Sequence, residues 1–356
     1  MTAAQEAPRV DDAGAPLPIR RWEIPCSTVG PNPALRPEDD APYVSRIRNA
    51  RSSRSFGRPI QPHIPRRTAP PTGPTMPTPK LDLAILFWFY KDLPLCENRV
   101  RLLRRHNPDA KIFGLYGGDP ADQEVFRRRL HGHLDDFYCF ETPQSAEWKW
   151  RNGDLLITEW YRQRGQSLDW DSVFIVQWDM LVMAAVDDLF PGLRQGSIVL
   201  SAVRPIQEAA GWFWRDDPTE RSNYDRFLAH VRRQYAPVDD PLWCIFIIAV
   251  LSREFLDRYS QVSQPELGFL EYRLPTYAQI FGIDVVQAEG VVVHAPGRSR
   301  SEVVLTVGDA IPLPNVARNL VTPSGARIFH PFRDPVPETF LGWVVAVLKK
   351  LLRGGD

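Results

Sequence analysis

The chain has 356 residues, 44% of them hydrophobic and 24% charged, so it can bury a full-sized core in one large domain or two small ones. Its 43 basic and 43 acidic residues cancel, and this balance argues against nucleic acid as a partner attracted by overall charge. No apolar run reaches the roughly 18 residues of a membrane span, which argues against an integral membrane protein.

The compartment is predicted from the first residues and from the cysteines. The opening MTAAQEAPRVDDAG carries early acids and no apolar core, unlike a secretory signal. The four cysteines are Cys26, Cys96, Cys139 and Cys244. They show no Cys-x-x-Cys spacing, which favours reduced thiols over a disulfide framework or a zinc site. The sequence therefore predicts a cytoplasmic protein.

Residues 1–78 hold nearly half of the 34 prolines and few apolar clusters. Such a segment cannot bury enough apolar surface to offset the entropy lost on ordering, so it is predicted to be a disordered N-terminal tail. Within it the stretch SRIRNARSSRSFGRPIQPHIPRR concentrates arginine. It is either a phosphate-binding segment or a solvated basic linker.

From Lys80 onward, apolar runs alternate with helical patterns, and this alternation predicts parallel crossovers in an α/β domain. Strands are predicted at 81–90, 111–118, 136–141 and 196–203, and helices at 95–110, 120–134, 147–164 and 223–235. Residues 242–251 predict a buried strand or a core helix, and residues 266–282 a helix interrupted at Pro275. Two short strands are predicted within 283–294, and residues 297–326 are predicted to be irregular.

The stretch LDWDSVFIVQWDMLV, residues 168–182, contains the strand around which the domain is predicted to be organised. Ser172–Val176 is an apolar run typical of a strand buried on both faces of a parallel sheet. Ligands bind outside the carboxyl ends of such strands, so Asp179, at the exit, is the candidate site residue. Asp169-Trp170-Asp171 spells Asp-x-Asp but lies at the other end, where a solvated turn is predicted.

Residues 81 to about 335 resemble the nucleotide-sugar-dependent glycosyltransferases of the GT-A fold, of the family 2-like kind. The resemblance rests on the opening strand and helix AILFWFYKDLPLCENRVRLLRRHNP, on IVQWD as a variant of the strand that ends in Asp-x-Asp, on LGFLEYRLPTYAQIFG, and on a late histidine, His330. It implies a single Rossmann-like GT-A domain at 79–338. A C-terminal amphipathic helix is predicted within 339–356.

The resemblance implies a nucleoside diphosphate sugar donor and a bound Mg²⁺ or Mn²⁺. Such a metal meets the charge that develops on the diphosphate leaving group. Asp179 and His330 are the implied ligands, and Gln177 stands where the motif has its first aspartate. Two alternatives remain: Asp179 caps the amides of residues 180–186, and His330 is a turn histidine before Pro331.

Glu271 is the catalytic candidate, a base for the acceptor hydroxyl in an inverting reaction. The alternative is that Glu271 and Arg273 form a structural ion-pair network. The donor nucleotide is expected over the ends of the first two strands, where stacking aromatics and small glycines suit it. The residues expected there are Phe89, Tyr90, Lys91, Asp92, Gly118 and Asp119. Ordinary core aromatics and a plain Gly-Gly turn are the alternative.

The sequence thus predicts a glycosyltransferase that moves a sugar to a hydroxyl of a saccharide, lipid-linked or protein acceptor, with no nucleic acid involved. A catalytically silent GT-A-like binding or scaffold protein is the alternative, prompted by Gln177 and the arginine-rich tail. The helix at 339–353 carries apolar residues on more than one face, with Lys349, Lys350 and Arg353 beside them. It predicts peripheral contact at the inner membrane face, or docking on the domain.

Overall fold

The computed structural model describes residues 81–209, 212–235, 238, 240–288, 303–307, 309–337 and Gly342. The predicted tail at 1–78 lies outside these residues. So do the second strand predicted within 283–294 and, apart from Gly342, the helix predicted at 339–353.

A seven-stranded sheet forms the centre of the domain, in the order β3-β2-β1-β4-β7-β6-β8. Its strands are β1 (Leu83–Phe89), β2 (Ile112–Tyr116), β3 (Asp136–Cys139), β4 (Ser172–Gln177), β6 (Ile198–Pro205), β7 (Leu242–Ser252) and β8 (Val285–Gln287). The β3-β2-β1-β4 half is parallel throughout, and β6 pairs parallel with β8. The predicted α/β fold with a mostly parallel sheet flanked by helices is therefore confirmed.

Strand β7 is the exception to the parallel arrangement, because it runs antiparallel to both neighbours, β4 and β6. Its sequence, LWCIFIIAVLS, is rich in aromatic and β-branched residues, which favour a strand. This resolves residues 242–251 as a strand and not a core helix. The inversion brings the start of β7 to the edge of the sheet where β4 ends.

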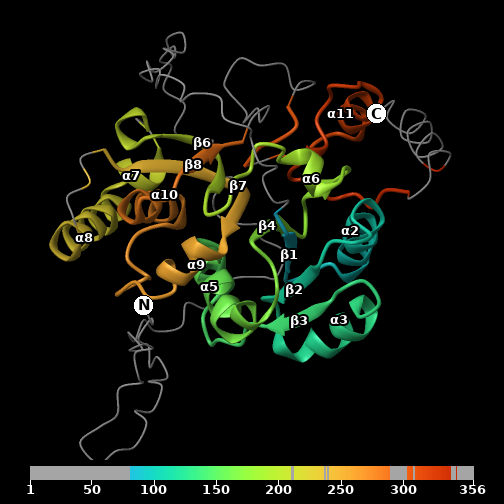
Figure 1. Ribbon diagram of the computed structural model, residues 1–356, viewed down its shortest axis with the longest axis horizontal. Helices are drawn as coiled ribbons and strands as arrows, with labels where there is room; N and C mark the ends of the chain where they lie inside the picture. The colour runs from blue at the N-terminus through green and yellow to red at the C-terminus, as the bar shows by residue number, and fades with distance from the viewer. Residues whose placement is uncertain are drawn as a thin grey trace, which may run out of the picture. The chain divides into compact units, whose positions relative to one another are not determined.

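Helices cover both faces of the sheet (Figure 1). One face packs against α5 (Gly153–Gln163), α8 (Pro218–Gln234), α9 (Arg253–Tyr259) and α10 (Leu270–Phe281). The other packs against α2 (Leu93–His106), α3 (Gln123–Leu130), α6 (Val186–Leu189) and α11 (Leu313–Val321). The remaining helices are α4 (Ala146–Arg151) and α7 (Phe213–Asp216), with 3₁₀ turns at Pro120–Asp122, Gly165–Ser167 and Ile206–Glu208. No helix in the described ranges is long and apolar enough to cross a bilayer.

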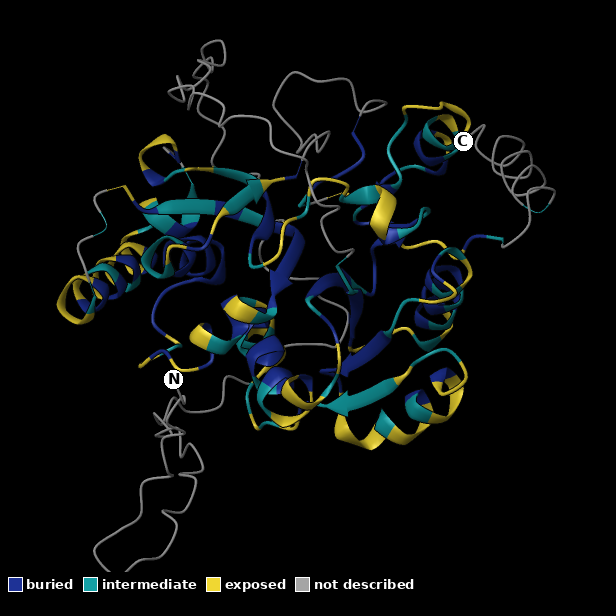
Figure 2. Ribbon diagram, in the orientation of Figure 1, coloured by how far each residue is buried: buried dark blue, intermediate teal, exposed yellow. Residues whose placement is uncertain are grey.

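The central strands are buried on both faces, whereas α3 and α8 keep an exposed outer side (Figure 2). Every residue of β1 is buried, as its unbroken apolar sequence LAILFWF predicts. Strand β4 is buried from Ser172 to Val176, and only Gln177 at its end is half-buried. The organising strand predicted from the sequence therefore lies at the centre of the core.

Three predicted elements differ from the structure, and the first is the helix at 147–164. It is two helices, α4 and α5, which meet at Asn152 in a non-helical conformation. Gly153 starts the second helix against the ring of Trp88, and a Cβ at Gly153 would lie 2.4 Å from that ring. The two helices therefore change direction at the position where the ring of Trp88, at the end of β1, leaves room only for glycine.

The second difference is that α10 continues through Pro275. Proline cannot donate to the carbonyl four residues earlier, which belongs to Glu271. The helix persists because it is packed, with each residue from Leu270 to Ala278 buried. The third difference is α11, within the stretch predicted to be irregular. Its apolar residues Leu313 and Val316 recur at helical spacing and are buried.

A second, two-stranded sheet joins β5 (Leu181–Val182) to β9 (Ile328–Phe329) in antiparallel register. This pairing places residue 330 beside the end of β4. The following segment is fixed to α2 by Asn98, whose side chain exchanges hydrogen bonds with the backbone of Val336, and by Arg99, which donates to the carbonyls of Phe332 and Asp334. Residues 330–336 are therefore held against the first helix of the domain.

A fully buried ion pair joins α5 to α10. The guanidinium of Arg273 donates from Nε to Oδ2 of Asp154 at 2.7 Å and makes a second bond to the other carboxylate oxygen. Both side chains are 0% exposed, so each charge depends on the other. Tyr259 of α9 also donates its hydroxyl to Asp154, and Arg273 reaches the Asn152 amide oxygen at 3.2 Å.

Replacement of Arg273 by methionine is expected to lower the free energy of unfolding by about 3–5 kcal/mol, because Asp154 would remain as a buried charge without its cation. Arg221→Met is the matched control. It breaks an ion pair with Asp225 whose side chains are 54% and 56% exposed, so the expected loss is below about 0.5 kcal/mol. Urea unfolding of the full chain measures both, and equal losses would contradict the role given to the buried pair.

Candidate functional site

The parallel strands β1, β2 and β4 end at one edge of the sheet, and the candidate residues follow these ends. In register, Phe89 pairs with Tyr116 and Trp88 pairs with Gln177, so the residues that leave the three strands emerge side by side. Asp179 lies two residues beyond the end of β4. Asp169, at the opposite end, has a side chain 98% exposed and paired with Lys111. Trp170 is buried and Asp171 accepts from the amide of Asp82 at 2.9 Å, so the Asp-x-Asp stretch is not a fully solvated turn.

Asp179 and His330 come together at this edge. Nε2 of the imidazole lies 3.4 Å from Oδ1 of the carboxylate, and Nε of Arg333 lies 3.9 Å from Oδ2. The Asp179 backbone carbonyl also accepts from the amide of Phe332 at 2.7 Å. The sheet of β5 and β9 explains this meeting of residues 151 positions apart, because it aligns residues 328–329 with 181–182.

The alternative role of Asp179, a cap for the amides of residues 180–186, is wrong. The chain after Asp179 enters β5, and α6 begins only at Val186. In the described hydrogen bonds, the amide of Val186 donates to the side chain of Asn107 instead. The Asp179 carboxylate is thus directed at His330 and Arg333.

Electrostatics keep Asp179 ionised although it is buried. Burial alone would raise its pKa, but the charge and hydrogen bond of His330 and the charge of Arg333 outweigh burial, and the pKa lies below its ordinary value. The other imidazole nitrogen, Nδ1, lies 3.1 Å from the carbonyl oxygen of Thr306. A carbonyl oxygen can only accept, so Nδ1 carries a proton and donates it to Thr306, while Nε2 faces the carboxylate of Asp179.

A carboxylate oxygen beside an imidazole nitrogen could serve a divalent cation once that nitrogen gives up its proton, and the carbonyl behind Nδ1 is the usual way to fix such a histidine. Within the described ranges, no group of three or more His, Cys, Asp or Glu side chains could hold a metal. Asp179 and His330 could therefore supply only two ligands to a cation, and oxygens of a bound ligand would have to complete its coordination shell.

Gln177, the variant position of the motif, is bound to β7. Its Nε2 donates to the carbonyl of Phe246 at 3.0 Å, on the neighbouring strand. The amide of the same Phe246 donates to Oε1 of Glu271 at 2.8 Å. Phe246 thus connects the end of β4 to the first turn of α10.

Phe246 lies where β7 departs from regular pairing. The register of β6 with β7 shifts on both sides of Ser201, and the Ser201 hydroxyl donates to Ile245 and accepts from Ile248. Side chains thus complete the hydrogen bonds of the irregular stretch. Neither Ser201 nor Phe246 was identified from the sequence, because neither carries a motif.

Glu271 is 9% exposed in the first turn of α10. Burial raises the pKa of this carboxyl to about 8, and the amide of Phe246 opposes the rise only in part. The alternative of an ion pair between Glu271 and Arg273 is wrong, because Arg273 pairs with Asp154. A carboxyl whose pKa lies near neutrality is suited to accept a proton in catalysis.

The residues expected to hold the donor divide into accessible and buried ones. Phe89 is 0% exposed and packs against Phe87, Tyr116 and Phe126, so its ring belongs to the core and cannot stack on a base. Tyr90 is 38% exposed and meets the ring of Trp178 edge to face at 5.7 Å.

Lys91 extends over these aromatic rings, with Nζ 5.0 Å from the ring centroid of Trp178. Asp92 caps α2, accepting from the amide of Leu95 at 3.1 Å, and has a left-handed backbone with a φ of 55°. Tyr90 and Lys91 therefore pack against the buried ring of Trp178, the residue that precedes Asp179.

The end of β2 approaches β1 closely. A Cβ at Gly118 would lie 2.4 Å from the carbonyl oxygen of Tyr90, so only glycine fits there. Asp119 caps the following turn through the amide of Ala121 at 2.9 Å. The sequence did not point to Lys149 of α4, whose ammonium donates to the carbonyl of Gly117 at 2.8 Å and has a pKa lowered by burial.

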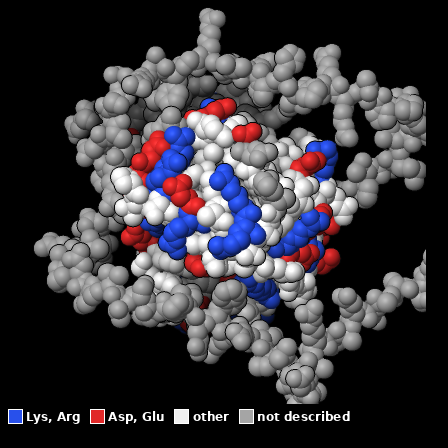
Figure 3. Space-filling model, turned by 90° about the vertical axis from the view of Figure 1, so that its left-hand side faces the viewer, with Lys and Arg blue, Asp and Glu red and all other residues white. Residues whose placement is uncertain are grey.

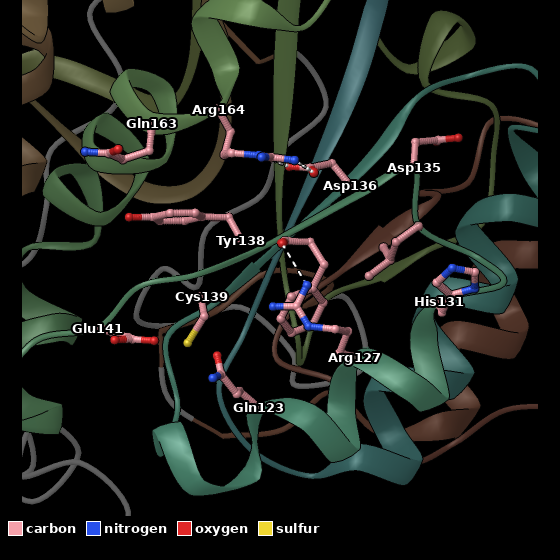
Figure 4. A pocket seen from close by; sticks show the side chains of 12 residues that line it. Gln123, Arg127, His131, Asp135, Asp136, Tyr138, Cys139, Glu141, Gln163 and Arg164 are labelled. Carbon is pink, nitrogen blue, oxygen red and sulfur yellow. Dashed lines mark hydrogen bonds and ion pairs between the residues drawn. The ribbon is translucent and has the colours of Figure 1, made fainter.

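A surface hollow of about 710 Å³ lies away from these residues, along β3 (Figure 4). It contains none of the predicted site residues. Arg164 is directed at Asp136, with which it forms an ion pair, and Arg127 donates to the Phe137 carbonyl at 3.5 Å. Its charged lining is thus engaged internally, and the candidate site remains at the ends of β1, β2 and β4.

The surface supplies no other focus of charge on the face drawn in Figure 3, where basic and acidic side chains are interspersed. Several pair within α8 or next to it, among them Arg221 with Asp225 and Arg151 with Glu220.

No family model matches the chain. No curated protein matches it either. Among solved structures, the chain is similar to the apo form of mouse xyloside xylosyltransferase 1, with 12% identity over 61% of this chain and 89% of that one and a TM-score of 0.32. It is also similar to galactosyltransferase LgtC in complex with donor and acceptor sugar analogues, with 13% identity over 75% of this chain and 94% of that one and a TM-score of 0.37. A third similar structure is a cytidylyltransferase from Leptospira borgpetersenii serovar Hardjo-bovis, with 10% identity over 58% of this chain and 76% of that one and a TM-score of 0.32.

Replacement of Glu271 by glutamine is expected to stabilise the protein at neutral and alkaline pH. The folded carboxyl, with a pKa of about 8, holds its proton when the unfolded one has lost it. The wild type therefore loses stability as the pH rises from about 4.5 to about 8. Between pH 5 and pH 8 the advantage of Glu271→Gln should grow by on the order of 3 kcal/mol.

Urea unfolding at the two pH values measures this difference. Glu254→Gln, at a half-exposed ion pair of α9, is the control and should show little pH dependence. An equal stability of Glu271→Gln and wild type at pH 8 would contradict a buried carboxyl with a raised pKa.

Proposed function

We propose that this protein is a metal-assisted glycosyltransferase, which transfers a sugar from a nucleoside diphosphate sugar to an acceptor hydroxyl. The pairing of Asp179 with His330 at the carboxyl end of β4 is the observation that carries the proposal. It would supply two ligands for a cation at the edge where an α/β sheet binds ligands.

Asp179 and His330 would hold Mn²⁺ or Mg²⁺, with the donor's phosphate oxygens completing the shell. When bound, the cation neutralises charge on the diphosphate leaving group. Arg333 beside Asp179, and Lys91 over the ring of the preceding Trp178, add positive charge. A dianionic diphosphate suits these cations better than a neutral ligand does.

Tyr90, whose ring packs against the buried Trp178, provides the apolar surface that a nucleobase or ribose would contact, and the glycine at 118 lets the chain approach a ligand closely. Glu271, held by the amide of Phe246, is proposed as the base that takes the proton from the acceptor hydroxyl. Its burial keeps the pKa near that of a working base, and its fixed oxygen limits the directions from which an acceptor can approach.

A catalytically silent binding protein is the second candidate, favoured by one observation. Gln177 bonds to the Phe246 carbonyl and carries no charge toward a metal. Turnover separates the two candidates: a silent protein binds a nucleoside diphosphate sugar without hydrolysing or transferring it.

Asp179→Asn is expected to weaken donor binding in Mn²⁺ by at least about 10-fold, because it removes the anionic metal ligand. Calorimetric titration with UDP-, GDP- and dTDP-sugars, with Mn²⁺ and with EDTA, measures this. Asp169→Asn is the matched control at the far end of the same strand, and its affinity should equal that of the wild type. The metal assignment fails if Asp169→Asn loses as much affinity, or if Asp179→Asn binds normally.

Glu271→Gln is expected to lower kcat by about 10²–10⁴-fold while donor affinity is retained, since only the proton acceptor is lost. For the wild type, kcat/KM should rise with pH and level off above about pH 8, where Glu271 is ionised. Initial-rate measurements from pH 6 to 9.5 test both. Wild-type rates in Glu271→Gln would exclude this residue as the base.

A further inference from the structure

Aromatic side chains from four elements gather around the start of α10, next to Glu271. They are Trp150 of α4, Trp212, Phe213 and Trp214 at α7, Trp243 of β7, and Phe269, which precedes α10. We call these six the aromatic surface. The proposed donor site uses none of the six.

The aromatic surface has a rigid base. Trp214 and Phe269 stack with ring centroids 4.1 Å apart, and both are buried. Trp150 lies over this pair, with its centroid 5.7 Å from Trp214 and 6.0 Å from Phe269. Trp212 packs against Trp243 at 4.8 Å. Rings held by other rings lose little freedom when a ligand binds.

The aromatic surface adjoins the candidate site at Trp150 and again at Phe269 and Trp243. Lys149, next to Trp150, donates to the carbonyl of Gly117 at the end of β2, so α4 lies at the carboxyl edge of the sheet. Phe269 lies two residues before Glu271 in the chain. Trp243 precedes by three residues the Phe246 whose amide holds Glu271.

Its chemistry combines exposed ring area with polar groups. Trp150 is 37% exposed, one of the few large apolar side chains that are so open in the described ranges. Arg151 lies with its guanidinium 4.8 Å from the ring centroid of Trp214 and forms a two-oxygen ion pair with Glu220. The indole Nε1 of Trp243 is buried and has no hydrogen-bond partner among the described residues.

We propose that the aromatic surface is the acceptor subsite and that the acceptor is a saccharide, bound by stacking of one pyranose ring on Trp150. A pyranose offers a face of C–H groups to an aromatic ring and a rim of hydroxyls to polar partners. This proposal rests on the proposed function, because it places the acceptor hydroxyl beside Glu271.

A lipid surface or a second protein chain fits the aromatic surface less well. Such partners need a broad apolar area, whereas Trp150 is the only one of the six rings that is more than about a third exposed. The ion pair of Arg151 with Glu220 lies beside it. One open ring with charged neighbours matches the size and polarity of a single sugar.

Direct binding tests the subsite without any donor. Saturation-transfer NMR of the full chain with methyl glucoside, galactoside, mannoside and xyloside should show at least one binder. Its affinity should fall about 10-fold in Trp150→Ala and be largely restored in Trp150→Phe, which keeps a ring. Val321→Ala, at a valine 74% exposed on α11, is the control and should bind as the wild type does.

Transfer supplies the second measurement. With the sugar donor that titration identifies, Trp150→Ala should raise the acceptor KM about 10-fold and lower the ratio of transfer to donor hydrolysis by a similar factor. The subsite is overturned if no glycoside binds, or if Trp150→Ala binds it as tightly as the wild type. Glycoside binding that depends on Trp150 in a protein without donor turnover would sustain the saccharide site and reject the proposed transferase.

Discussion

The buried ion pair between Asp154 and Arg273 is the interaction on which the arrangement of this site depends. Two charges removed from water are tolerated only when each faces the other in good geometry, so the pair fixes α5 and α10 relative to each other. Glu271 lies half a turn from Arg273 on the same helix. The buried pair therefore also fixes the position from which the Glu271 carboxyl accepts a hydrogen bond from the amide of Phe246.

The site also contains a residue that opposes folding. A carboxyl buried deeply enough to have a pKa near 8 is one whose ionised form is poorly solvated, and at neutral pH an amide would serve the hydrogen bond to Phe246 equally well. A structural role alone thus gives no physical reason for glutamate at position 271. The Asp154 carboxylate, by contrast, accepts hydrogen bonds from the guanidinium of Arg273 and the hydroxyl of Tyr259, so its buried charge is compensated.

The sequence was sufficient for the buried strands, but it missed α11 and the features that follow from distant contacts. Unbroken apolar runs identified β1 and β4, and the rule that ligands meet strand ends pointed to Asp179. The partner of Arg273 lies 119 residues away in the chain, and no periodicity reports such a contact. The buried state of Phe89 was likewise hidden, because strand-end aromatics look alike whether they face a ligand or the core.

The anchoring of residues 330–336 to α2 has a consequence for how the protein acquires its site during synthesis. The first helix of the domain emerges from the ribosome more than two hundred residues before the segment that carries His330. Asn98 and Arg99 therefore cannot bond to the carbonyls of Val336 and Phe332 until these residues have been synthesised. The polar ends of both side chains stay hydrated until β9 has formed. A nascent chain can thus build the sheet and still lack the pairing of Asp179 with His330, so the contacts of α2 with residues 332–336 and the meeting of these two side chains form together, late in synthesis.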